Sequence, residues 1–188
     1  MEKDQLIPAF GRQEGFYPRY NHFKKLLDCV EKDSKLFSSD SASITLGIGK
    51  SHVKALKFWG LALKIIREEA RGVFIDELGI KILADDAYLE KLETIMLLQE
   101  AGLSLPCRIP SWYFLFREFK QTEFTKQDLI EAIQKWQKEE FPDIQVAGNA
   151  IEKDVNCILG MYLDTESPFS ELNLIQNNGE YYRLRSGI

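Results

Sequence analysis

The chain of 188 residues is long enough for one domain or two small ones, and 45% hydrophobic with 12% aromatic residues is enough to build a hydrophobic core. These figures exclude a chain that is disordered throughout. The 24 basic and 29 acidic residues give a net charge of −5. Taken as an average, this charge argues against a nucleic-acid binder, because such domains are usually basic.

The charge is distributed unevenly along the chain. Residues 1–80 contain 13 basic and 11 acidic residues, whereas residues 81–188 contain 11 basic and 18 acidic residues. Between residues 48 and 72, six basic residues face only two acidic ones. We therefore expect any anionic partner to contact this stretch rather than the molecule as a whole.

The first half of the chain predicts helices followed by a hairpin. Apolar residues at helical spacing predict a helix over Tyr20–Lys32, with Asn21 as its cap. A polar loop over residues 38–43 and a short apolar piece over 44–46 lead to a second helix, for which Ser51 is the expected cap.

The spacing of the apolar residues changes after the second predicted helix. An apolar segment, a polar turn ending in Gly72 and the β-prone residues 73–75 predict a hairpin, after which Glu77–Ala84 resumes a helix. Helix, turn, helix, hairpin and helix is the order of elements in a winged helix-turn-helix.

In the second half of the chain, residues 125–184 are predicted to echo the helix–break–helix–hairpin order of residues 20–75. The predicted helices are an apolar one through Leu98, an aromatic-rich one over Trp112–Phe119, one over 126–139 capped by Thr125, and one over Ala150–Leu163. Asn-Gly within Asn177–Glu180 lies between two apolar segments and predicts a closing hairpin.

The sequence thus predicts a mainly α protein with minor β structure (α+β minor), made of winged helix-turn-helix-like modules with small β-hairpins. The expected division is an N-terminal winged-helix-like DNA-binding module, residues 1–84, and a helical C-terminal module, residues 85–188. A second winged helix is one option for the C-terminal module.

Positive charge gathers on one face of the second predicted helix. Lys50, Lys54 and Lys57 recur at a spacing of three to four residues, and the hairpin adds Arg67 and Arg71. In a helix-turn-helix this helix contacts base edges and phosphates. The alternative is a solvated helix face that happens to be basic. The predicted DNA-binding residues are Lys50, Ser51, His52, Lys54, Lys57, Arg67, Arg71 and Arg19.

Arg19 belongs to the aromatic segment Gln13–Tyr20, which precedes the first helix. Aromatic rings next to an arginine can hold nucleic acid by stacking and phosphate contact. The alternative is an arm packed across the core, with Arg19 paired to a carboxylate.

No group of residues predicts a catalytic or metal site. The two histidines have no cysteine nearby, and Cys29, Cys107 and Cys157 are too far apart for a disulfide framework or a zinc ribbon. The segment ending in Gly49-Lys50-Ser51 lacks the first glycine of a phosphate loop. Catalytic residues therefore stay unassigned, and no cofactor is evident.

No apolar run approaches the roughly 20 residues of a membrane span, and residues 1–5 are charged. We therefore expect a cytoplasmic protein with reduced thiols and no membrane partner.

Five segments, in order along the chain, resemble one bacterial family. They are Gly11–Tyr20 (GRQEGFYPRY), Leu46–Lys50, Asp86–Glu90, Ile151–Val155 and Ser167–Leu172. The sequence resembles the SspB-type component of single-strand DNA phosphorothioation (Ssp) defence systems, a family of unknown function. The likeness extends over about residues 10 to 184, and family members are often longer.

The resemblance implies a DNA-binding subunit of an anti-phage defence system with a DNA-nicking activity, and a divalent metal if it nicks DNA. It also implies partners: a cysteine desulfurase, an ATPase and a reductase-like protein. The alternatives are a non-enzymatic interaction subunit, whose acidic second half docks a basic protein, and a winged-helix transcriptional regulator.

Two positions depart from the family pattern. Gln13 stands where the family tends to carry His, and Gly15 stands where it tends to carry Thr. If that histidine serves chemistry, nicking by this chain is in doubt; if it only packs, nothing changes.

Overall fold

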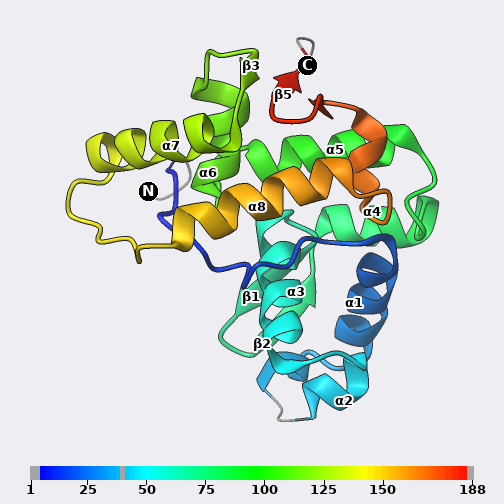
Figure 1. Ribbon diagram of the computed structural model, residues 1–188. Coiled ribbons are helices and arrows are strands. Elements are labelled where there is room, and N and C mark those ends of the chain that lie inside the picture. The colour runs from blue at the N-terminus through cyan, green and yellow to red at the C-terminus, as the bar shows by residue number, and fades with distance from the viewer. Residues whose placement is uncertain (1–4, 39–40, 186–188) are drawn as a thin grey trace.

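The structure is a computed structural model that describes residues 5–38 and 41–185, and helices dominate it (Figure 1). The first half contains α1 (Tyr20–Lys32), η1 (Leu36–Ser38), α2 (Ala42–Leu46), α3 (Lys50–Ala62), β1 (Ile66–Glu69), β2 (Gly72–Ile75) and α4 (Glu77–Asp85). The second half contains α5 (Leu92–Leu103), α6 (Pro110–Tyr113), η2 (Phe114–Glu118), β3 (Glu123–Phe124), α7 (Lys126–Glu140), α8 (Ala150–Leu163), η3 (Pro168–Leu172), β4 (Ile175–Asn177) and β5 (Tyr182–Leu184). The predicted class, mainly α with minor β, is confirmed.

Two predicted helix caps are wrong. The N-cap of α1 is Arg19 rather than Asn21, because the helix begins at Tyr20 and the His22 side chain accepts the Arg19 backbone N–H. The N-cap of α3 is Gly49 rather than Ser51, because α3 begins at Lys50, two residues earlier than a helix capped by Ser51 would begin. The predicted cap Thr125 is confirmed, since its side chain accepts the Asp128 backbone N–H.

The loop predicted over residues 38–43 is shorter than expected. Residues 42–46 form α2, which includes the apolar piece 44–46, and residues 39–40 lie outside the described part of the chain. Gly47 ends α2 with a φ of 61°, a left-handed conformation that glycine adopts without a steric penalty.

Both predicted hairpins are present. β1 pairs antiparallel with β2, from Ile66 opposite Ile75 to Glu69 opposite Gly72. β4 pairs antiparallel with β5 around the turn at Asn178 and Gly179. β5 also pairs with β3, so the second sheet has the order β3-β5-β4, and the sequence analysis did not predict β3.

The aromatic-rich helix predicted over Trp112–Phe119 is divided into α6 and a π-helical turn, η2. Trp112 lies at the centre of the core, where its ring centroid is 6.1 Å from that of Trp59 on α3. Its Nε1 donates to the Tyr162 hydroxyl on α8. One connected set of buried side chains therefore extends through both halves of the molecule.

Residues 5–19, the N-terminal arm, cross the molecule before α1 begins (Figure 1). The arm starts beside the loop before α6, where Ile7 N donates to Cys107 O. It passes the first turns of α8, where Gly11 N donates to Asp154, and then α3, where Phe16 O accepts from Trp59 Nε1. The arm therefore holds both halves together.

All three cysteines are free thiols, with Cys107 and Cys157 buried. No helix in the described ranges, 5–38 and 41–185, is long and apolar enough to cross a bilayer. The winged-helix character of the two modules and their boundary at residue 84 stay predictions.

Candidate functional site

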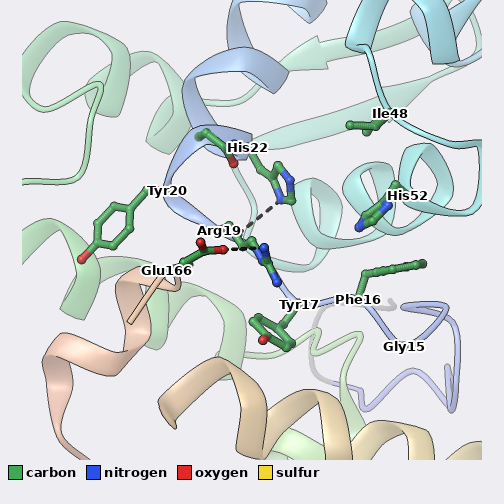
Figure 2. Close-up of a pocket in the computed structure, with 10 residues that line it drawn as sticks. Gly15, Phe16, Tyr17, Arg19, Tyr20, His22, Ile48, His52 and Glu166 are labelled. Carbon is green, nitrogen blue, oxygen red and sulfur yellow. Dashed lines mark hydrogen bonds and ion pairs between the residues drawn. The ribbon is translucent and has the colours of Figure 1, made fainter. Parts of the chain in front are cut away.

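A pocket of about 500 Å³ lies where the N-terminal arm meets the starts of α1 and α3 (Figure 2). We call it the arm pocket; it is lined by Gly15, Phe16, Tyr17, Arg19, Tyr20, Asn21, His22, Ile48, His52 and Glu166. Two of the segments singled out in the sequence, Gly11–Tyr20 and Leu46–Lys50, both contribute to this lining. Chain folding thus brings together motifs that are about thirty positions apart.

Two histidines face each other in the arm pocket (Figure 2). The ring centroids of His22 and His52 are 6.1 Å apart, and the Phe16 ring lies 3.6 Å from the His52 ring. Burial, followed by the positive charges of His52, Arg19 and Lys25, lowers the pKa of His22 to about 4. Burial and the charge of Arg19 also lower the pKa of His52. His22 is therefore neutral at pH 7, and because its Nδ1 accepts the Arg19 backbone N–H, its Nε2 carries the proton and can donate.

Arg19 lies in the arm pocket but is engaged by acidic residues. Its Nη1 donates to Glu166 Oε2, and its Nη2 lies 3.8 Å from Asp164 Oδ2. The Tyr17 hydroxyl donates to the same Asp164 carboxylate at 2.5 Å. These contacts match the alternative interpretation of this segment, in which the arm packs across the core and Arg19 pairs with a carboxylate.

The second candidate surface is the lysine face of α3, made of Lys50, Lys54 and Lys57. The buried side of α3 carries Val53, Leu56 and Trp59, which leaves the three lysines toward solvent. Lys50 and Lys54 are exposed, and neither forms an ion pair with another residue of the described ranges. Their charges are therefore available to an anionic partner.

The remaining predicted cations are paired with acidic groups. Lys57 Nζ lies 2.6 Å from Glu68 Oε1. On the hairpin, Glu69 pairs with both Arg67, at 3.0 Å, and Arg71, at 3.5 Å. The hairpin thus lies beside the lysine face, as predicted, but contributes little unpaired positive charge.

His52 does not share the lysine face. Helix geometry turns successive residues by about 100°, so the side chain of His52 leaves α3 roughly 160° away from those of Lys50 and Lys54. Ser51 is exposed at the start of the same helix. The eight predicted residues therefore fall into two groups. His52 and Arg19 line the arm pocket, and the other six lie on α3 and the hairpin.

Sequence reasoning missed His22 and Glu166 as members of the pocket. His22 has no metal-ligand spacing around it, and Glu166 comes from a loop 147 residues after its partner Arg19. The only sequence feature that indicated the arm pocket was the aromatic content of the segment before α1.

Among the described residues, no group of three or more His, Cys, Asp and Glu side chains could hold a metal ion.

Comparison with known proteins places the chain in a family. The family model described as "Protein of unknown function (DUF4007)" matches residues 10–187. The chain belongs to the DUF4007 family. No curated protein matches it.

Two crystal structures resemble the DUF4007 chain over 98% of its length at 30% sequence identity. They are an SspB structure, with a TM-score of 0.87, and a magnesium ion-bound SspB structure, with a TM-score of 0.86. The resemblance to SspB-type proteins drawn from the sequence is thereby confirmed. The chain spans 62% of the length of these SspB chains.

One departure from the family pattern can now be placed in the DUF4007 chain. Gln13 is buried, with 3% of its surface exposed, and its Nε2 donates to Asp154 Oδ1 at 2.6 Å. Asp154 also accepts from Gly11 N and from Ser111 Oγ. Position 13 therefore serves packing in this chain, and it does not line the arm pocket.

Proposed function

We propose that this DUF4007 chain is a DNA-binding component of an Ssp-type DNA phosphorothioation defence system and acts in the cytoplasm. The similarity to SspB supports the system, and the lysine face supports the contact with DNA. The observation that carries the proposal is a pair of exposed lysines on one helix face, Lys50 and Lys54, which form no ion pair with any residue that the structure describes.

The mode of binding follows from the distribution of charge. Lys50 and Lys54 offer compact charges to phosphate oxygens, and each neutralised phosphate releases condensed counterions from DNA. The net charge of −5 repels DNA from other faces of the molecule. Binding is therefore one-sided, weak at physiological salt and steeply dependent on salt concentration.

The proposal also includes what the family resemblance implies. The chain would nick DNA, and it would act with a desulfurase, an ATPase and a reductase-like protein. No residue of the chain is assigned a catalytic role.

The test measures binding of a fluorescent 20-base-pair duplex by anisotropy between 25 and 200 mM salt. We expect Lys50→Gln/Lys54→Gln to reduce affinity at low salt about tenfold and to reduce the salt slope by about 2, since the slope is about −0.9 per phosphate contact. The matched control is Lys135→Gln/Lys138→Gln, which removes two exposed lysines from α7. Equal affinity of the two double variants would exclude the lysine face.

A non-enzymatic interaction subunit is the second candidate, and one observation favours it. Lys57, Arg67, Arg71 and Arg19 are all paired with acidic side chains, so much of the local positive charge is neutralised within the chain. Absence of duplex binding at 25 mM salt would support this candidate, whereas binding of one sequence far above all others would support a transcriptional regulator.

A further inference from the structure

The arm pocket and the lysine face lie on different sides of α3. His52 and Phe16 meet on the side covered by the N-terminal arm, whereas Lys50 and Lys54 point toward solvent about 160° away. Duplex DNA lying on the lysine face does not enter the pocket. Any ligand of the pocket would therefore be separate from duplex DNA bound on the lysine face.

The volume and lining of the pocket fit a planar, polar ring. About 500 Å³ is within the range of about 300–1,000 Å³ that is typical of small-molecule sites. The Phe16 ring already lies against the His52 imidazole at 3.6 Å, which provides an aromatic surface for stacking. His22, His52 and the Asn21 amide provide both donors and acceptors, as the edge of a nucleobase requires.

Positive charge is placed at the rim of the same pocket. Arg19 lies beside Tyr17 and Glu166 in Figure 2. Lys25 is not among the residues that line the pocket, but its charge contributes to the lowered pKa of His22. A phosphate attached to a ring in the pocket would meet the Arg19 guanidinium at this rim, where it would compete with the acidic partners of Arg19.

Glu166 and Asp164 both oppose such a ligand: the Glu166 carboxylate pairs with Arg19 and lines the pocket, and Asp164 Oδ2 lies 3.8 Å from Arg19 Nη2. The Glu166 side chain is 63% exposed, so its ion pair is accessible to water and contributes little to stability. A phosphate can therefore replace the Glu166 carboxylate on Arg19. Because the phosphate must displace Glu166 from Arg19, Glu166 lowers the affinity of the pocket for such a ligand.

We propose that the arm pocket binds a nucleoside monophosphate unit, with the base against Phe16 and His52 and the phosphate on Arg19. Two sources supply this chemistry: a free nucleotide and the phosphorylated end of a single DNA strand. Neither source needs the lysine face.

The experiment is isothermal titration of the full chain with dAMP and with a four-nucleotide single strand carrying a 5′ phosphate, alongside deoxyadenosine and inorganic phosphate. We expect dAMP or the oligonucleotide to bind at least tenfold more tightly than inorganic phosphate or deoxyadenosine. Tighter binding of dAMP indicates a free nucleotide, and tighter binding of the oligonucleotide indicates a strand end. No binding of either at millimolar concentration, or equal binding of inorganic phosphate, overturns the proposal.

Three variants connect the binding to the pocket. Arg19→Gln should weaken dAMP binding at least tenfold, whereas Glu166→Gln should strengthen it severalfold by freeing Arg19. A gain in affinity cannot result from a misfolded chain. The matched control is Arg12→Gln, an exposed arginine of the same arm that does not line the pocket. If Arg12→Gln weakens binding as much as Arg19→Gln, or Glu166→Gln brings no gain, the site assignment is wrong.

Duplex binding of the unmodified chain is measured in parallel. Nucleotide binding without duplex binding overturns the proposed DNA-binding function alone, and the reverse result overturns only the nucleotide pocket.

Discussion

Gln13 Nε2 donates a 2.6 Å hydrogen bond to Asp154 Oδ1, a contact that joins the N-terminal arm to α8 across 141 positions of the chain. The same carboxylate accepts from Gly11 N at 2.8 Å and from Ser111 Oγ at 2.6 Å. Asp154 is 2% exposed, so water does not replace these partners. A single buried carboxylate therefore anchors the arm that forms one wall of the pocket.

Replacing this carboxylate tests the anchor. Asp154→Ala leaves three buried donors without an acceptor, and we expect it to lower the free energy of unfolding by about 3 kcal/mol. Asp154→Asn can still accept from Gly11 and Gln13 while its amide donates to Ser111, so we expect a change within about 1 kcal/mol. Urea denaturation at pH 7 measures both variants. Equal losses for alanine and asparagine would show that the hydrogen bonds do not hold the arm.

His22 and Asp154 give the stability of the protein opposite responses to acid. Burial lowers the pKa of His22 to about 4, below its ordinary value of 6.5, so the unfolded state binds more protons between these values and the free energy of unfolding falls as the pH falls. Burial raises the pKa of Asp154 to about 6, above its ordinary value of 3.8, despite the hydrogen bonds from Ser111, Gln13 and Gly11. The folded state therefore gains stability as the pH falls from about 6 toward 4.

Two neutral variants separate these responses. Between pH 7 and pH 4.5, we expect His22→Gln to lose less stability than the unmodified protein and Asp154→Asn to lose more. Urea denaturation series at several pH values provide the comparison. Stability curves that run parallel for all three proteins would contradict the altered pKa values.

Freeing Lys57 should strengthen the proposed contact with DNA. Glu68→Gln removes the carboxylate that lies 2.6 Å from Lys57 Nζ. We expect a twofold to fivefold gain in duplex affinity at low salt, with a salt slope larger by about 0.9 if Lys57 gains one phosphate contact. Glu139→Gln, which makes the same change of charge on α7, is the control for net charge. An equal gain from both variants would mean that only the overall charge matters.

Close packing between α4 and the segment before β1 predicts an unusual response to alanine. A Cβ on Gly79 would lie 2.2 Å from the Ile65 carbonyl oxygen, too close for any real contact. Gly79→Ala should lower the free energy of unfolding by about 1–3 kcal/mol, although alanine is the better helix former. Gly148→Ala adds a Cβ in open space and should change it by less than about 0.5 kcal/mol. Thermal or urea unfolding compares the two, and a stabilised Gly79→Ala would contradict the packing.

Local sequence patterns were sufficient to predict the elements whose ends are marked by nearby residues. The helices α1 and α8 have the predicted limits, because a clear apolar period ends at polar residues on either side. Both hairpins follow from their turn signals: the polar segment that ends at Gly72, the first residue of β2, and Asn178-Gly179. Thr125 is recognisable because a capping residue precedes an amphipathic run.

The features that sequence reasoning missed depend on contacts between distant segments. β3 contains only Glu123 and Phe124, too few residues for a period, and it exists because β5 pairs with it. His52 looked like a neighbour of Lys50, but the arm covers its side of α3 with Phe16. No local sequence pattern predicts the ion pair between Glu166 and Arg19.

The long reach of the arm has a consequence for protein synthesis. Arg19 is made 147 residues before Glu166, and Gln13 is made 141 residues before Asp154. On the ribosome, α1, α3 and the first hairpin emerge while the arm still lacks these partners. A nascent chain therefore contains the residues of its basic helix well before the partners of the arm, Asp154 and Glu166, have been made.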